Sequence, residues 1–234
     1  MPRRSRLQLP GVPLHITHRG VNRAAVFIDD EDRCHYLRLL EQMVIEHQVA
    51  VHAYVLMDNH IHLLATAMRS DAVASALRRL AQCHVQSVNR RHRRTGTLWE
   101  GRFKSCLVDS DRYLLTVYRY IELNPVRARM VDRPEQYAWS SVHANAHLRV
   151  DPIVVPHPCY VALHADPRER ATLYRAWLHE GVDEEQLGAI RTHLAQERAY
   201  GDRRFQEMVE RTLNRPATVR PRGRPPRPAE DATD

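Results

Sequence analysis

The stretch VAVHAYVLMDNHIHLLATA, residues 49–67, decides the fold because it contains two candidate strands separated by one tight turn. Residues 49–57 are rich in β-branched and aromatic side chains, and residues 60–67 repeat this apolar character after the polar pair Asp58 and Asn59. Strands joined by so short a polar turn pair antiparallel. The stretch therefore predicts a β-hairpin.

Helical patterns lie on both sides of this hairpin. The first runs from residue 29 or 30 to about residue 48, and the second from residue 70 or 71 to about residue 91. Residues 13–19 and 103–108 are typical of strands, and a further helix begins at residue 110 or 111 and is interrupted by Pro125. This order predicts an α+β, ferredoxin-like split β-α-β fold, with an antiparallel sheet and two helices on one face.

Three segments are expected along the chain. Residues 1–150 form the core domain, and residues 151–213 form a helical extension after a proline-bearing linker. Residues 214–234 form a disordered basic tail, because residues 214–228 contain five arginines, five prolines and no acid. The extension carries helical patterns at residues 167–180, 183–199 and 202–213.

One short segment of the tail has a recognisable composition. Residues 221–225, PRGRP, are similar to the core of an AT-hook, an extended element that places arginine in the narrow minor groove of A·T-rich DNA. A plain disordered tail explains the segment equally well.

The positive charge is concentrated in one part of the chain. The 234 residues contain 35 cations, of which only Lys104 is a lysine, against 28 acids, for a net charge of +7. Residues 78–104 contain eight cations and one acid, Glu100, so this window alone carries +7. It also holds the aromatic residues Trp99 and Phe103, and aromatic rings can stack on unpaired bases. The window predicts a nucleic-acid surface, although a solvated helix face would carry the same charge.

Several classes of protein do not fit the composition. No run of 18 apolar residues exists, and the arginines near the N-terminus are not followed by an apolar run, so neither a spanning helix nor a secretory signal is expected. The four cysteines are far apart and form no C-x-x-C pair, which disfavours a disulfide framework or a cysteine zinc site. We therefore expect a cytoplasmic protein without a membrane partner.

Two histidines of the hairpin are candidate metal ligands. His60 and His62 are separated by one residue, and positions i and i+2 of a strand face the same side of a sheet. Both imidazoles can therefore reach one metal ion. The chain contains fifteen histidines, so an H-x-H triplet can also arise by chance and be structural.

A second candidate group lies in the helix before Pro125. Tyr120 and Asn124 are four residues apart and share one helix face, whereas Tyr118 points about 200° away from Tyr120. Tyrosines of a helix are also ordinary packing residues, and Asn124 before a proline can simply end the helix.

Together, these motifs resemble a known family. Residues 57–64, MDNHIHLL, resemble the MPNHVHLL motif of HUH single-tyrosine transposases, and residues 119–128, RYIELNPVRA, match their tyrosine helix. The similarity covers residues 5–145, includes THRG at 17–20, GRFK at 101–104 and WSS at 139–141, and is greatest to the REP-associated tyrosine transposases. Asp58 stands where the family often has proline.

The resemblance implies a reaction and a site. Tyr120 is the expected catalytic nucleophile, and His60, His62 and Asn124 are the expected ligands of Mg²⁺ or Mn²⁺. The expected reaction is cleavage and rejoining of single-stranded, hairpin-forming DNA through a 5′-phosphotyrosine, by a monomer or a homodimer. From the basic window, the aromatic residues and the resemblance, the candidate DNA-binding residues are Arg19, Arg78, Arg79, Arg90, Arg91, Arg93, Arg94, Trp99, Arg102 and Lys104.

Two other functions stay open on the sequence. The ferredoxin-like layout is also that of common RNA-binding domains, so a non-catalytic single-stranded nucleic-acid-binding module would explain the charge. A metal-dependent phosphodiesterase that uses activated water would explain the histidine pair and leave Tyr120 structural.

Overall fold

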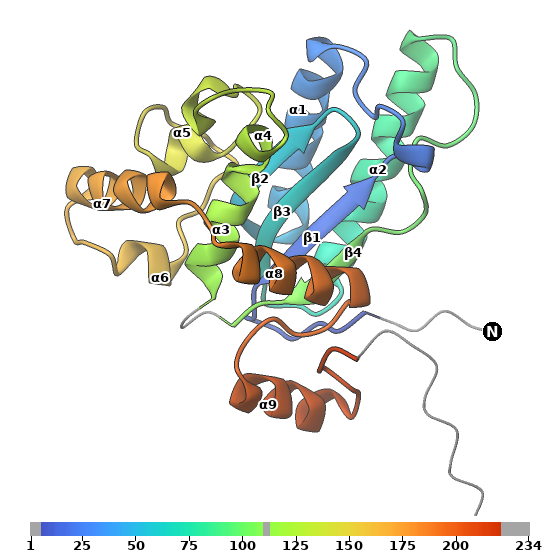
Figure 1. Cartoon of the computed structure of the whole chain (residues 1–234). Helices are drawn as coiled ribbons and strands as arrows, with labels where there is room; N and C mark the ends of the chain where they lie inside the picture. The colour runs from blue at the N-terminus through green and yellow to red at the C-terminus, as the bar shows by residue number, and fades with distance from the viewer. Residues whose placement is uncertain (1–5, 110–112, 221–234) are drawn as a thin grey trace, which may run out of the picture.

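A four-stranded antiparallel sheet forms the centre of the molecule. The structure, a computed structural model, describes residues 6–109 and 113–220 (Figure 1). The strands are β1 (Leu14–Arg19), β2 (Val49–Met57), β3 (His60–Ala67) and β4 (Lys104–Leu107), in the order β2-β3-β1-β4. Every neighbouring pair is antiparallel. The ferredoxin-like, split β-α-β prediction is confirmed.

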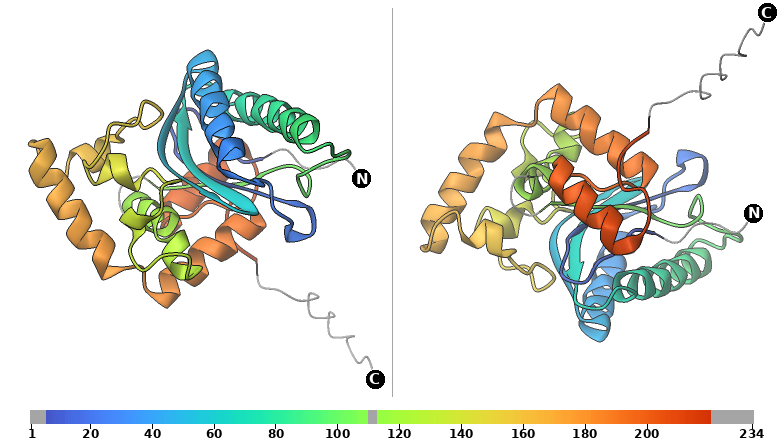
Figure 2. Two further views of the ribbon diagram at one scale, coloured as in Figure 1. Left: turned by 90° about the horizontal axis from the view of Figure 1, so that it is seen from above. Right: turned by 90° about the horizontal axis from the view of Figure 1, so that it is seen from below.

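Two helices cover one face of the sheet, as predicted. These helices, α1 (Asp30–His47) and α2 (Ala72–Arg91), pack against each other and against alternate residues of the strands, such as Ile16 and Leu63 (Figure 2). The N-terminus of α1 is capped by Asp29, whose carboxylate accepts a hydrogen bond from the Asp32 backbone N–H at 3.1 Å. This apolar layer fixes which residues of each strand face the other way.

The opposite face carries the helix that contains Tyr120. Helix α3 (Leu114–Glu122) is followed directly by the short helix α4 (Asn124–Arg127). The two helices are separated at Leu123, and Pro125 lies in the first turn of α4. The predicted interruption by Pro125 is therefore confirmed. The predicted start at residue 110 or 111 lies outside the described residues.

Further helices complete this second layer. Beyond α4 the chain forms α5 (Val142–Asn145), α6 (Pro158–Val161), α7 (Pro167–Glu180), α8 (Glu184–Gln196) and α9 (Arg203–Leu213), while two short 3₁₀ turns, η1 and η2, span Val21–Arg23 and Pro134–Gln136. Helix α8 contacts β4, β1 and α3, and side chains of α7 and α8 share an apolar cluster with α3 and the sheet. Helices α7 and α8 of the expected extension at residues 151–213 therefore pack on the sheet face that carries α3 (Figure 1), whereas Val209 of α9 belongs to the apolar cluster that contains α1 and α2.

The first residues of the expected tail are packed against the fold. Residues 214–220 are ordered: Ala217 is fully buried, its N–H donates to Glu210 at 2.7 Å, and its carbonyl accepts from Ala199 at 2.9 Å. The prediction of disorder from residue 214 is wrong for these residues, because they fold back onto α9 and the segment after α8. The AT-hook-like segment 221–225 lies outside the described residues. No helix in the described ranges is both long and apolar enough to cross a bilayer.

Candidate functional site

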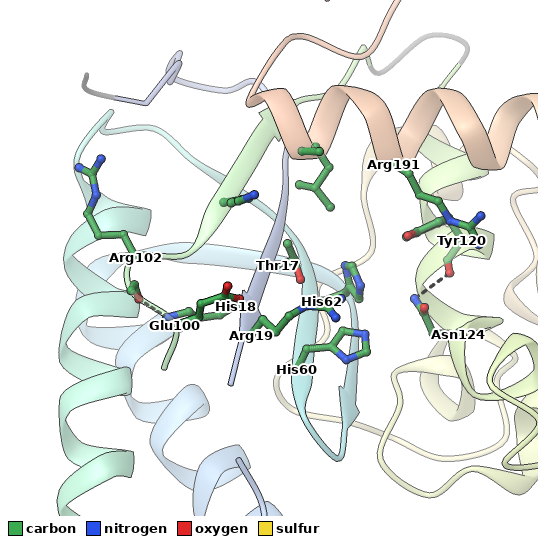
Figure 3. A pocket seen from close by; sticks show the side chains of 14 residues that line it. Thr17, His18, Arg19, His60, His62, Glu100, Arg102, Tyr120, Asn124 and Arg191 are labelled. Carbon is green, nitrogen blue, oxygen red and sulfur yellow. Dashed lines mark hydrogen bonds between the residues drawn. The ribbon is translucent and has the colours of Figure 1, made fainter. Parts of the chain in front are cut away.

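A cavity of about 500 Å³ lies between the sheet, helices α3 and α4, and α8 (Figure 3). We call it the His–Tyr cavity. Its lining includes Thr17, Arg19, His60, His62, Glu100, Arg102, Lys104, Tyr120, Asn124 and Arg191. The structure thus brings the four residues predicted for metal binding and catalysis into one cavity of one chain. Strand alternation explains the arrangement, since Ile61 and Leu63 pack toward α1 and α2 and so turn His60 and His62 toward α3.

Hydrogen bonds leave one nitrogen of each imidazole facing the cavity. The Nδ1 atom of His60 lies 2.6 Å from Oδ1 of Asn59, and the Nδ1 atom of His62 lies 2.9 Å from Nε2 of His15. The His60 and His62 ring centroids are 5.2 Å apart. Both Nε2 atoms are therefore the candidates for ligation.

Both imidazoles are neutral at physiological pH. Burial, with a smaller contribution from Arg19, lowers the pKa of His60 to about 4. Burial and neighbouring histidines hold the pKa of His62 well below its usual value. A neutral imidazole has the lone pair that metal coordination requires.

Asn124 offers an oxygen from the opposite wall. Its Nδ2 donates to the backbone carbonyl oxygens of Tyr120 at 3.0 Å and Ile121 at 3.3 Å. Its Oδ1 atom is thereby left as the acceptor of the side chain. Two imidazole nitrogens and an amide oxygen form a donor set that suits Mn²⁺, or Mg²⁺ with additional water and phosphate ligands.

The Tyr120 ring lies among histidines and an arginine. Its centroid is 5.6 Å from that of His62 and 5.4 Å from that of His15. The guanidinium of Arg127 lies 4.5 Å from the ring centroid and donates to the Tyr120 backbone carbonyl. Burial lowers the pKa of Arg127 to about 10, so this group stays a cation at neutral pH. A positive charge is therefore held beside the phenol ring.

Tyr118 lies in a different environment. Its side chain is fully buried in the apolar cluster beneath α3, where the ring packs against Tyr160 and Tyr174. Its hydroxyl oxygen accepts from the backbone N–H of His157 at 3.3 Å. Unlike Tyr120, it does not line the His–Tyr cavity.

Only some of the predicted DNA-binding residues lie at a cavity in the structure. Arg19, Arg102 and Lys104 line the His–Tyr cavity, and Arg78 lines a neighbouring cavity of about 690 Å³ that shares Arg102 with it. The remaining arginines of the window lie outside both cavities, on α2 or directly after it: Arg79, Arg90, Arg91, Arg93 and Arg94.

Two residues of the basic window have structural contacts that change their interpretation. Trp99 is only 5% exposed and stacks on His18 with ring centroids 4.0 Å apart, and it also lines the cavity that contains Arg78, so its main contacts are structural and its role toward DNA stays a prediction. Arg91 donates to Asp29 at 2.6 Å, to Asp32 at 2.9 Å and to Glu31 at 2.6 Å. Its charge joins α2 to the N-terminus of α1, which corrects the prediction that it serves phosphate.

A second group of possible metal ligands lies at this junction. Ligand atoms of Asp29, Asp32 and His92 are all within 4.8 Å of one another. The guanidinium of Arg91 already binds both carboxylates, and His92 Nε2 lies 3.0 Å from Asp32. The His60, His62 and Asn124 set is therefore the better candidate for a metal beside Tyr120.

Three residues of the site were missed by the sequence analysis. The sequence could have indicated Arg127, because it lies seven residues, or two helical turns, after Tyr120. His15 faces the same side of β1 as Thr17, but only the pairing of β1 with β3 places it beside His62. Arg191 had no signal, since only the docking of α8 brings it to the cavity.

Comparison with known proteins agrees with this geometry. The family model described as "Transposase IS200 like" matches residues 9–124, which include both histidines, Tyr120 and Asn124. The chain belongs to the IS200-like transposase family. No curated protein matches the sequence of this transposase. A solved structure described as the REP-associated tyrosine transposase bound to a REP hairpin has the same fold, with 18% identity and a TM-score of 0.55, over 68% of this chain and 93% of that chain.

Proposed function

We propose that this transposase cleaves and rejoins single-stranded, hairpin-forming DNA through a covalent bond between Tyr120 and a 5′-phosphate. One observation carries the proposal: Tyr120, Asn124, His60 and His62 line a single cavity, together with cations from three parts of the chain. We infer that one chain holds a complete site, and that the protein acts in the cytoplasm on repeats related to REP elements.

The Tyr120 phenol is the proposed nucleophile. Its oxygen attacks the scissile phosphorus in line, the new O–P bond forms as the bond to the 3′-oxygen breaks, and the 3′-oxygen takes up a proton. The hydroxyl proton of Tyr120 must leave as the attack proceeds. Arg127, with its guanidinium 4.5 Å from the ring centroid, favours the negative charge that develops there.

The donor set fits a divalent ion, Mg²⁺ or Mn²⁺. His60, His62 and Asn124 would hold it, and the bound ion would supply polarisation of the scissile phosphate. The chain's own part is to keep both imidazoles neutral and to hold Tyr120 on the opposite wall. Asn124 also fixes the end of α3, since its amide donates to the Tyr120 carbonyl.

Positive side chains are proposed to hold the DNA backbone. Arg19, Arg102 and Lys104 enter the His–Tyr cavity from the sheet side, and Arg191 enters it from α8. The extension at 151–213 thus contributes a cation to the site. Arg78 continues the basic surface into the neighbouring cavity, and contacts of this kind make affinity fall with salt concentration.

A denaturing gel with two labelled oligonucleotides tests the proposal. The tyrosine reaction leaves the downstream fragment on the protein, so a 3′-labelled hairpin oligonucleotide migrates with the protein and a 5′-labelled one yields a free fragment. Cleavage without an adduct would indicate activated water, and binding without cleavage would indicate a non-catalytic module.

The matched variants are Tyr120→Phe and Tyr118→Phe. Tyr120→Phe keeps the ring and its contact with Arg127 but removes the nucleophile, so cleavage is lost and hairpin binding stays within about twofold of wild type. Adduct formation by Tyr120→Phe, with loss in Tyr118→Phe, would refute the assignment.

A further inference from the structure

A hydrogen bond joins one candidate metal ligand to a histidine outside the cavity. Nε2 of His15 lies 2.9 Å from Nδ1 of His62, and the two ring centroids are 5.1 Å apart. His15 is fully buried and does not line the His–Tyr cavity. Its ring also contacts that of Tyr120, but its hydrogen bond reaches a candidate metal ligand, His62.

The direction of this hydrogen bond decides whether His62 can be a ligand. A neutral imidazole carries one N–H proton, on either Nδ1 or Nε2. If Nδ1 of His62 donates to His15, its Nε2 presents a lone pair to the cavity. If Nδ1 accepts, Nε2 carries the proton and cannot coordinate.

The tautomer of His60, by contrast, is fixed by its hydrogen bond to Asn59. The amide nitrogen of Asn59 donates to the backbone carbonyl of Arg23 at 3.0 Å, which fixes the orientation of that amide. Its Oδ1 atom, 2.6 Å from Nδ1 of His60, is an acceptor only. The His60 proton is thus held on Nδ1, and Nε2 has the lone pair.

We propose that His15 is the positioning residue that gives His62 the same tautomer. In this arrangement Nε2 of His15 accepts from Nδ1 of His62, and the proton of His15 is on its own Nδ1. That Nδ1 atom is buried and has no hydrogen-bond partner in the described part of the chain, so its N–H is unsatisfied and the gain from a metal-bound His62 must exceed this cost. The inference rests on the proposed metal site.

Binding of Mn²⁺ to the full-length protein, followed by electron paramagnetic resonance without DNA, tests this role. His15→Phe fills a similar volume but cannot accept, and loss of such a supporting contact weakens metal affinity by about 10–100-fold. His15→Gln restores an acceptor and keeps the affinity within about threefold. His52→Gln is the matched control, because this buried histidine bonds to Thr66 and Val155, away from the cavity.

The outcomes separate the inference from the proposed function. Wild-type affinity in His15→Phe, with loss in His62→Ala, overturns the role of His15 alone. Unchanged affinity in His62→Ala overturns the metal site and the inference with it. If His15→Phe does not fold, the ¹⁵N spectrum of the Mg²⁺-loaded wild type decides: a proton on Nδ1 of His62 supports the role, and a proton on its Nε2 contradicts it.

Discussion

Glu122, at the end of the Tyr120 helix, couples the stability of the fold to pH. Its carboxylate is fully buried and accepts hydrogen bonds from Ser141 at 2.6 Å, Asn145 at 2.7 Å and Tyr174 at 2.7 Å. Burial raises the pKa of this carboxyl from 4.5 to about 7, against the lowering effect of the three hydrogen bonds. We expect Glu122→Gln to remove a pH-dependent loss of stability.

The direction of this pH effect on stability follows from whether the folded or the unfolded state holds the proton of Glu122. Between pH 4.5 and about 7 the folded state keeps a proton on Glu122 that the unfolded state has released, so stability falls as pH rises through this window. A difference of about 2.5 in pKa at ~1.4 kcal/mol each makes the loss about 3 kcal/mol once the pH exceeds both values. The side-chain amide introduced by Glu122→Gln cannot titrate, so the variant avoids this loss.

Urea unfolding of wild type and Glu122→Gln at pH 5 and pH 8 measures the effect. We expect the free energy of unfolding of the variant, relative to wild type, to rise by about 2.5 kcal/mol between these pH values, because about 1 kcal/mol of the loss has already occurred at pH 5. Contributions of other groups cancel in the difference, and Glu46→Gln, which changes an exposed carboxyl on α1, serves as control. Parallel pH curves for Glu122→Gln and wild type would refute the reasoning.

Three other outcomes are expected. Burial lowers the pKa of His52 and of His84 to about 4, so each costs up to about 3 kcal/mol of stability as pH falls from 6.5 toward 4. Urea unfolding of His52→Gln and His84→Gln against wild type over this pH range checks this, and parallel curves would contradict it. Arg91→Met lowers the melting temperature but leaves hairpin affinity within about twofold. Arg78→Ala weakens hairpin binding and reduces the slope of log affinity against log salt concentration by about one, so filter binding at several salt concentrations distinguishes the two variants. Trp99→Ala lowers the free energy of unfolding by about 3–5 kcal/mol, and equal stability in chemical denaturation would count against its core position.

Local patterns were sufficient to predict the sheet. They also predicted the two pairs of candidate site residues, one on a strand and one at the end of a helix. The short turn at Asp58 and Asn59 fixes the β2–β3 pairing, and strand alternation then puts His60 and His62 on one face. The four-residue spacing of Tyr120 and Asn124 places them together at the end of α3. Each of these relations spans only a few residues, which is why the sequence could specify it.

Contacts between distant segments could not be predicted. Arg91 was interpreted as a phosphate ligand because its neighbours are cations, but its partners are acids about 60 residues earlier. Trp99 lies in a stretch that is mostly polar and charged, yet it stacks on His18, since the loop before β4 folds over the sheet edge. The contribution of Arg191 depends on the docking of α8, and no pattern near that residue indicates it.

Mass spectrometry of the trypsin-digested protein–DNA adduct tests most directly whether Tyr120 is the nucleophile. Trypsin cleaves after Arg112, Arg119 and Arg127, so Tyr120 is the only tyrosine of the peptide 120–127, while Tyr113 and Tyr118 are in the peptide 113–119. We predict that the nucleotide mass is found on the peptide 120–127. Its presence on the peptide 113–119, or cleaved DNA without any modified peptide, would contradict the proposed mechanism.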